Sequence, residues 1–111
     1  MAGSVDVGDD LRGRDARLLM QALLGLRDEG EARALLLDLC TPGEVADLAL
    51  RLKVARMLAA GATYETVGAA TGASTATISR IRRCVEHGAG GYRKVVARLA
   101  AEGAEDVDGE G

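Results

Sequence analysis

Residues 63–84, TYETVGAATGASTATISRIRRC, contain the pattern that decides the fold. A short helical run begins at Thr63 and is interrupted at Gly72, and a second run begins at Ser74 and leads into three arginines. In a helix-turn-helix, a short turn that often contains glycine joins two helices, and the second helix enters the DNA major groove. The spacing therefore predicts a helix-turn-helix over about residues 63–84.

The residues at the predicted junction have the chemistry that such a turn requires. Gly72 can adopt the positive φ at which many helices end. Ser74 can accept a hydrogen bond from a free amide of the next helix, whose N-terminus would favour a phosphate. Gly68 and Ala69 are small, and we expect them to let the two helices approach closely.

The second helix of this motif is expected to have two different faces. Ile78, Ile81 and Val85 recur at helical spacing and form an apolar stripe. We expect this stripe to pack on Val67. The opposite side has small, hydroxylated and basic side chains, which suit groove entry and contacts with phosphates or guanines, although a helical hairpin with a solvated basic face would look similar. The residues predicted to contact DNA are Ser74, Thr75, Ala76, Ser79, Arg80 and Arg83.

The formal net charge of −3 is unevenly distributed along the chain. Eight of the seventeen acidic residues lie before Arg12 or in the last ten residues, whereas all fourteen basic residues lie between Arg12 and Arg98. That central region has nine acidic residues and a net charge of +5. The low pI therefore belongs to the ends of the chain and is compatible with a nucleic-acid partner.

The length of 111 residues is typical of one domain. We expect an all-α domain over residues 13–102, between a disordered arm at 1–12 and an acidic disordered tail at 103–111. Two tyrosines are the only aromatic residues, so the core has to be built from aliphatic side chains. Such a small core is thin, which favours dimerisation.

A long helix is expected over residues 42–59. Thr41 and Glu44 have the spacing of a capping box before it, and Gly61 follows its end. Its apolar residues surround the axis, a pattern typical of a helix that is buried on several sides. In a chain of this length, that pattern favours burial by a second subunit. Further helices are expected at residues 14–27, 31–39 and 92–102, the last after a flexible glycine-rich hinge at 88–91.

Several classes of protein lack support in the sequence. Cys40 and Cys84 are isolated thiols without the spacing of a zinc site or a redox pair. The single histidine, His87, has no nucleophile and carboxylate arranged with it, and we expect it to interact with its helix C-terminus or a phosphate. We expect no enzyme and no metal site. Without a leader or an apolar run of about 18 residues, we expect a cytoplasmic protein with no membrane partner.

The stretch LLLDLCTPGEVADLALRLKVARMLAAGATYETVGAATGASTATISR, residues 35–80, resembles the tryptophan repressor (TrpR) family, and more closely its YerC/YecD-type group. The likeness extends to about residue 92 and includes the LCTPGE opening and the late GGY. This resemblance implies a bacterial, all-α, intertwined homodimer. Such a dimer would present two helix-turn-helix units to a near-palindromic operator in double-stranded DNA.

The resemblance also implies a candidate effector site. In the tryptophan repressor, two arginines hold an indole corepressor between the long helix and the recognition helix, with a threonine nearby. Thr41, Arg51 and Arg80 fall on these positions, and Cys84 stands where the family has a serine. An amino-acid-like or aromatic corepressor would suit two arginine planes. A partly exposed Arg51 and a phosphate contact at Arg80 would require no effector, so no cofactor is certain.

Two functions are compatible with these patterns. The first is a sequence-specific DNA-binding transcription regulator, expected to be a repressor that acts as a homodimer. The alternative is a helical adaptor without DNA that docks a protein partner through the same hairpin. The basic cluster favours the first, because its residues face only Glu86 among nearby acids. The cluster comprises Arg80, Arg82, Arg83, Arg93, Lys94 and Arg98.

Overall fold

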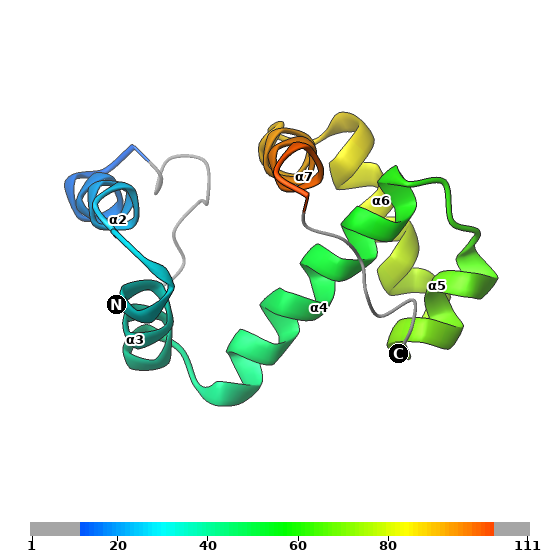
Figure 1. The fold of residues 1–111 in the computed structure, drawn as a ribbon, viewed down its shortest axis with the longest axis horizontal. Coiled ribbons are helices and arrows are strands. Elements are labelled where there is room, and N and C mark those ends of the chain that lie inside the picture. The colour runs from blue at the N-terminus through cyan, green and yellow to red at the C-terminus, as the bar shows by residue number, and fades with distance from the viewer. Residues whose placement is uncertain (1–11, 104–111) are drawn as a thin grey trace. The chain divides into compact units, whose positions relative to one another are not determined.

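The computed structural model describes residues 12–103, which form helices and no strand (Figure 1). The all-α fold class predicted from the sequence is confirmed. The arm expected at 1–12 and the tail expected at 103–111 lie, except for Arg12 and Gly103, outside the described residues. The helices are α2 (Arg14–Leu24), α3 (Glu29–Leu39), α4 (Pro42–Ala59), α5 (Tyr64–Thr71), α6 (Thr75–His87) and α7 (Gly91–Ala101). The chain divides into two compact units, Met1–Pro42 and Gly43–Gly111.

The first unit contains α2 and α3, whose bounds differ slightly from those expected. Helix α2 ends before Gly25 instead of continuing to residue 27. Helix α3 begins two residues earlier than expected, because the Asp28 carboxylate accepts a hydrogen bond from the Glu31 amide at 2.9 Å. The Glu31 carboxylate in turn accepts from the Arg27 amide at 3.0 Å. These two hydrogen bonds resemble a capping box, with Arg27 in place of Asp28 as the second donor, and stabilise the start of α3.

Neither α2 nor α3 contains a buried residue within the single chain. Leu24 is the most exposed of their large apolar side chains, at 85%. Helix α3 also exposes Leu39, at 57%. The other large apolar side chains exposed on these helices are Leu18, Leu19, Met20, Leu23 and Leu37.

Helix α4 has the bounds that the sequence predicted. Its end is closed by two hydrogen bonds, from the Ala62 amide to the Met57 carbonyl and from the Gly61 amide to the Leu58 carbonyl, both at 3.0 Å. This pair is a Schellman motif, and Gly61 takes its positive φ of 94°. The capping box of Thr41 and Glu44 at the other end stays a prediction.

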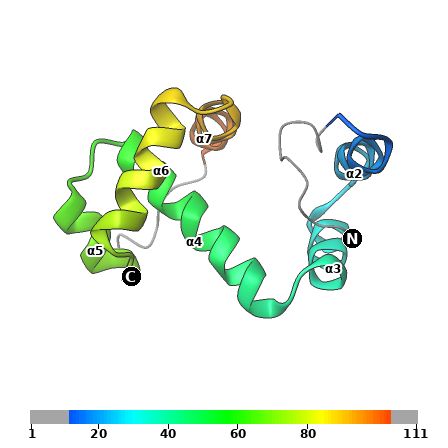
Figure 2. The same cartoon turned by 180° about the vertical axis from the view of Figure 1, so that it is seen from behind.

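The core of the second unit is formed where α4, α5 and α6 meet (Figure 2). Val67 is fully buried, and Ile78 and Ile81 are 1% and 3% exposed. The predicted packing of the α6 stripe on Val67 is therefore confirmed. Val54 and Ala55 of α4 complete this cluster, and Val85 packs against its edge. The first half of α4 takes no part, and Leu48 there is 51% exposed.

The glycines between α6 and α7 form a turn with specific steric requirements. A Cβ atom at Gly88 would overlap with the carbonyl oxygen of Cys84, so the chain passes too close to α6 for any side chain there. Gly90 precedes α7 with a φ of 95°. On α7, Tyr92 and Val96 pack against the core, whereas Val95 is 41% exposed.

Candidate nucleic-acid interface

The turn of the predicted helix-turn-helix consists of three residues between α5 and α6. Gly72 has a φ of 76° and donates its amide hydrogen to the Gly68 carbonyl at 2.8 Å. The Thr71 hydroxyl donates to the Val67 carbonyl at 2.7 Å and accepts from the Ala73 amide at 3.1 Å. The predicted positive φ at Gly72 is confirmed, and Thr71 adds a side-chain bridge across the turn.

Both helices of the motif begin with a hydroxyl cap. The Ser74 hydroxyl accepts from the Thr77 amide at 3.2 Å, as the sequence predicted for α6. The Thr63 hydroxyl accepts from the Thr66 amide at 3.1 Å at the start of α5. Each cap satisfies one amide of the first helical turn, which defines where the helix begins.

Of the two small residues expected at the helix crossing, Gly68 faces α6 and Ala69 does not. A Cβ atom at Gly68 would lie 3.6 Å from the Ala73 carbonyl oxygen and 3.9 Å from Cδ1 of Ile78, which are ordinary van der Waals distances. Ala69 is exposed in the chain. The approach of α5 to α6 therefore requires no glycine at 68 and does not involve Ala69.

The face of α6 opposite the core is open to solvent. Ser74, Thr75 and Ala76 at its start are exposed, and so are Arg80 and Arg83 further along. Neither arginine side chain forms a hydrogen bond or an ion pair with the described residues. Their guanidinium groups are therefore available to an external anion. We call the surface formed by these five residues the recognition face.

Ser79 differs from the other residues predicted to contact DNA. It is only half-exposed, and its hydroxyl donates to the Tyr64 hydroxyl of α5 at 3.5 Å. Position 79 lies between the buried stripe and the recognition face, so its side chain can reach the neighbouring helix. The sequence pattern alone placed it outward, because period counting does not show which side chain of another helix it meets.

Arg82 is engaged within the motif. Its Nε donates to the Glu86 carboxylate at 3.0 Å, and its guanidinium lies over the Tyr64 ring, 5.7 Å from the centroid. The hydrogen bond to Glu86 is the main cause that holds the pKa of Arg82 above its ordinary value, followed by the interaction with Tyr64. Arg82 thus stays charged and is directed toward α5.

Arg93 is also used inside the chain. Its guanidinium donates to the carbonyls of Val85 and Glu86, at 3.2 and 2.8 Å, where α6 ends. A cation at this position satisfies carbonyls that lack a helical partner. The basic cluster predicted from the sequence therefore divides, because Arg82 and Arg93 have internal partners. The side chains of Arg80, Arg83, Lys94 and Arg98 are exposed and have no hydrogen bond or ion pair with the described residues.

The remaining predicted site residues occupy exposed or half-exposed positions. His87 is the last residue of α6, and its Nε2 lies 4.0 Å from Oε1 of Glu86. Among the candidate effector residues, Arg51, Arg80 and Cys84 are exposed on the second unit, and Thr41 is exposed on the first. A cavity of about 260 Å³ in the second unit includes none of these four residues. It is lined by Leu58, Gly61, Ala62, Thr63, Arg82, Val85 and Glu86.

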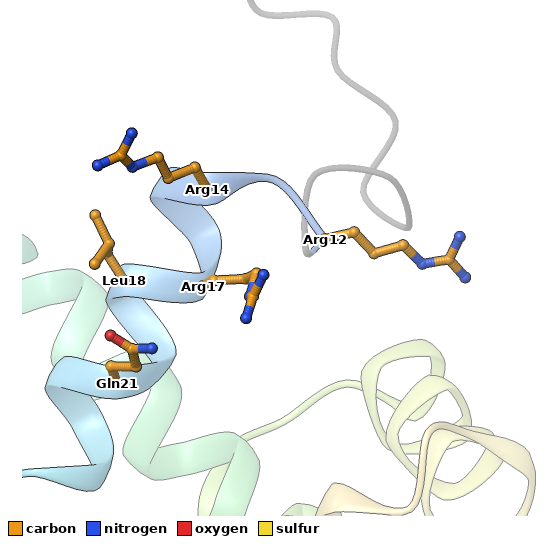
Figure 3. Close-up of a pocket in the computed structure, with 5 residues that line it drawn as sticks. All are labelled: Arg12, Arg14, Arg17, Leu18 and Gln21. Carbon is orange, nitrogen blue, oxygen red and sulfur yellow. The ribbon is translucent and has the colours of Figure 1, made fainter.

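A second basic group, at the start of α2, was not recognised in the sequence. Arg12, Arg14 and Arg17 surround an open cavity of about 390 Å³ together with Leu18 and Gln21 (Figure 3). The guanidinium groups of Arg12 and Arg14 point in opposite directions, so they do not converge on one point (Figure 3). The signal in the sequence was the RGRDAR spacing.

Membrane spans and metal clusters are both absent from residues 12–103. None of the helices in this range combines the length and the hydrophobicity that a membrane span needs. No group of three or more histidine, cysteine, aspartate or glutamate side chains in the same range could hold a metal ion.

Comparison with known proteins connects this geometry to a family. The family model of the Trp repressor protein matches residues 14–100. The chain belongs to the Trp repressor family. The uncharacterised protein YerC of Bacillus subtilis (strain 168) is 45% identical over 91 residues, which cover 82% of this chain and 88% of YerC. The resemblance predicted from the sequence is confirmed.

Two solved structures have the same fold. A TrpR-like protein from Eubacterium eligens is 41% identical, with a TM-score of 0.78, over 83% of this chain and 95% of that one. A candidate Trp repressor from Staphylococcus aureus is 38% identical, with a TM-score of 0.78, over 87% and 96% of the two chains. The Trp repressor family comprises helix-turn-helix DNA-binding regulators and is not a family of enzymes.

Proposed function

We propose that this Trp repressor family protein is a sequence-specific transcription repressor that binds an operator through α6. The observation that carries the proposal is the asymmetry of this helix. Ile78 and Ile81 are buried in the core, whereas the recognition face is exposed and includes two arginines without described partners. A helix with one side packed on the core and the other side exposed can enter the major groove.

The recognition face has two chemical zones. The small side chains of Ser74, Thr75 and Ala76 allow the N-terminus of α6 to come close to base edges. Arg80 and Arg83 lie further along the helix, where guanidinium groups can contact phosphates or guanine. We propose that the first zone selects the sequence and that the second contributes most of the electrostatic affinity.

The repressor acts as a homodimer in this proposal. The support is the apolar surface that a single chain leaves exposed, which includes Leu24 at 85%, Leu39 at 57% and Leu48 at 51%. A second copy would bury this surface, and at about 25 cal/mol per Å² its burial would stabilise the dimer. Two symmetric α6 helices would read half-sites about 34 Å apart, so the operator would be a near-palindrome.

The effector and the limits of the domain complete the proposal. Thr41, Arg51, Arg80 and Cys84 would hold an amino-acid-like or aromatic corepressor, in the arrangement that the family implies. Residues 13–102 would form the regulatory domain, between a disordered arm and an acidic tail, in the cytoplasm. Thermal melting of the wild type and of Arg51→Ala, each with added aromatic amino acids, tests the effector site. An amino acid that raises the melting temperature of the wild type should leave that of Arg51→Ala unchanged.

Selection of bound fragments from random duplex DNA tests the main proposal. The wild type should enrich a near-palindrome. Ala76→Gln should enrich a different sequence without loss of folding, because Ala76 is exposed and a glutamine there can pair with adenine. Ala97→Gln, the same change at an exposed alanine of α7, is the matched control and should select the wild-type sequence.

Two outcomes would contradict this proposal. Wild-type protein that enriches no sequence would favour the protein-docking adaptor instead. Identical selected sequences and affinities for the wild type and Ala76→Gln would show that the start of α6 does not read DNA.

A further inference from the structure

Tyr64 is the one residue of α5 that makes polar contacts with two successive turns of α6, within the part of the chain that the structure describes. Its ring is half-buried and packs against the core. Its hydroxyl accepts a hydrogen bond from Ser79 at 3.5 Å, and Arg82 lies over its ring at 5.7 Å. Ser79 and Arg82 are three residues apart, so they are neighbours on one side of the helix.

These contacts give the packing of α6 on α5 a preferred direction, which the aliphatic core lacks. Val67, Ile78 and Ile81 hold α6 against α5 by burying apolar surface, and this attraction has no preferred direction. A hydrogen bond and a cation–π contact both have preferred geometries. Together, the contacts of Tyr64 add a directional restraint on the rotation of α6 about its own axis to the burial of Ile78 and Ile81. Glu86 holds Arg82 in this position through its 3.0 Å hydrogen bond.

The rotation of α6 matters for DNA because the residues that contact Tyr64 are adjacent to the arginines of the recognition face. Arg80 follows Ser79, and Arg83 follows Arg82, so each recognition arginine lies about 100° around the helix from a residue that Tyr64 contacts. A change in the rotation would therefore displace both arginines relative to the groove by the same angle.

We infer that Tyr64 is a positioning residue for DNA recognition, and that Ser79 acts on sequence preference through the Tyr64 hydroxyl instead of bonding a base. This inference rests on the proposed function. It predicts that the two hydroxyls act as one unit, because removing either of them breaks the same contact.

A double-mutant cycle on the full chain tests the inference. The variants are Tyr64→Phe, which keeps the ring under Arg82, Ser79→Ala, and the two changes combined. The measured quantity is the ratio of the affinity for the selected operator to the affinity for random DNA of equal length. Each single change should lower this ratio about threefold, the scale of one modest hydrogen bond. The double change should lower it no further, because the partners are coupled.

Tyr92→Phe is the matched control. Tyr92 is also half-exposed and packs against the core, but its hydroxyl has no hydrogen-bond partner among the described residues. The affinity ratio of this variant should equal that of the wild type, and thermal melting should show all four variants folded.

Several results would overturn the inference. Independent effects that multiply to about ninefold in the double variant, with a changed base preference only in Ser79→Ala, would show that Ser79 contacts a base directly. An unchanged ratio in Tyr64→Phe, or an equal loss in Tyr92→Phe, would remove the special role of Tyr64. A wild type that does not distinguish operator from random DNA would instead defeat the proposed function, and the inference with it.

Discussion

Helices α5 and α6 bury their apolar side chains inside one chain, whereas α2 and α3 bury none of theirs. Val67, Ile78 and Ile81 are at most 3% exposed, but Leu24 and Leu39 are 85% and 57% exposed. Both regions have the helical spacing of apolar residues in the sequence. The difference teaches that the helix-turn-helix folds around its own core, while α2 and α3 leave large apolar side chains exposed in the single chain.

The largest effect is expected from Ile78→Ala in the core. A truncated buried isoleucine leaves a cavity, and such changes cost about 2–5 kcal/mol of unfolding free energy. Because a small domain has only about 5–15 kcal/mol in total, this variant should lose a large share of its stability. Urea denaturation followed by circular dichroism measures the change. A loss below about 1 kcal/mol would show that the helix-turn-helix depends on other contacts.

Leu24→Ala tests the role of the apolar side chains that α2 and α3 leave exposed. If a second copy covers Leu24, the truncation should weaken the dimer by about 1.5–3 kcal/mol per chain, the value of one buried leucine side chain. Sedimentation at micromolar concentration should then show the wild type at twice the chain mass and the variant partly dissociated. A wild type that sediments with the mass of one chain would contradict the dimer.

Two glycines of the motif should respond in opposite directions to alanine. Gly72→Ala places a side chain at a φ of 76°, which should cost about 1–2 kcal/mol of stability. Gly68→Ala adds a methyl group at ordinary contact distance inside a helix, and should raise stability by about 0.5–1 kcal/mol. Thermal melting of the pair measures both. A destabilised Gly68→Ala would show that the helix crossing is too tight for any side chain at position 68.

The smallest effect on folding is expected from Arg83→Ala, which should change DNA binding alone. Loss of one phosphate contact should weaken binding to operator and random DNA about equally and reduce the salt slope by roughly 1. Arg33→Ala is the matched control, because Arg33 is an exposed arginine of the first unit whose partner is Glu29 at 3.2 Å. Its slope should equal that of the wild type. An unchanged slope in Arg83→Ala would remove Arg83 from the phosphate contacts.

The parts of the site that the sequence predicted are those that depend on local rules. Gly72, Ser74 and the stripe of Ile78 and Ile81 could be placed because turn geometry, capping and helical period act over four residues or fewer. The capping pair of Asp28 and Glu31 obeys the same rules and was missed, although its spacing was visible.

The residues that the sequence misplaced are those with partners on another element. Ser79 was placed outward by its period, but the structure turns it toward Tyr64, fifteen residues earlier. Arg93 was counted in the basic cluster predicted to favour DNA, yet it donates to carbonyls at the end of α6. Arginines have similar charge wherever they lie, so composition cannot separate those with internal partners from those open to DNA.

The sequence by itself determined the helices of the second unit, the turn between α5 and α6, and the family to which the chain belongs. The helices and the turn follow from short-range hydrogen bonding, backbone angles and the period of the helix. The family follows from the sequence motifs themselves. Only the tertiary structure decided which of the arginines on α6 and α7 are engaged within the chain, and how α6 contacts α5. Those outcomes depend on distances between side chains of different helices, and such distances exist only after the aliphatic core has packed.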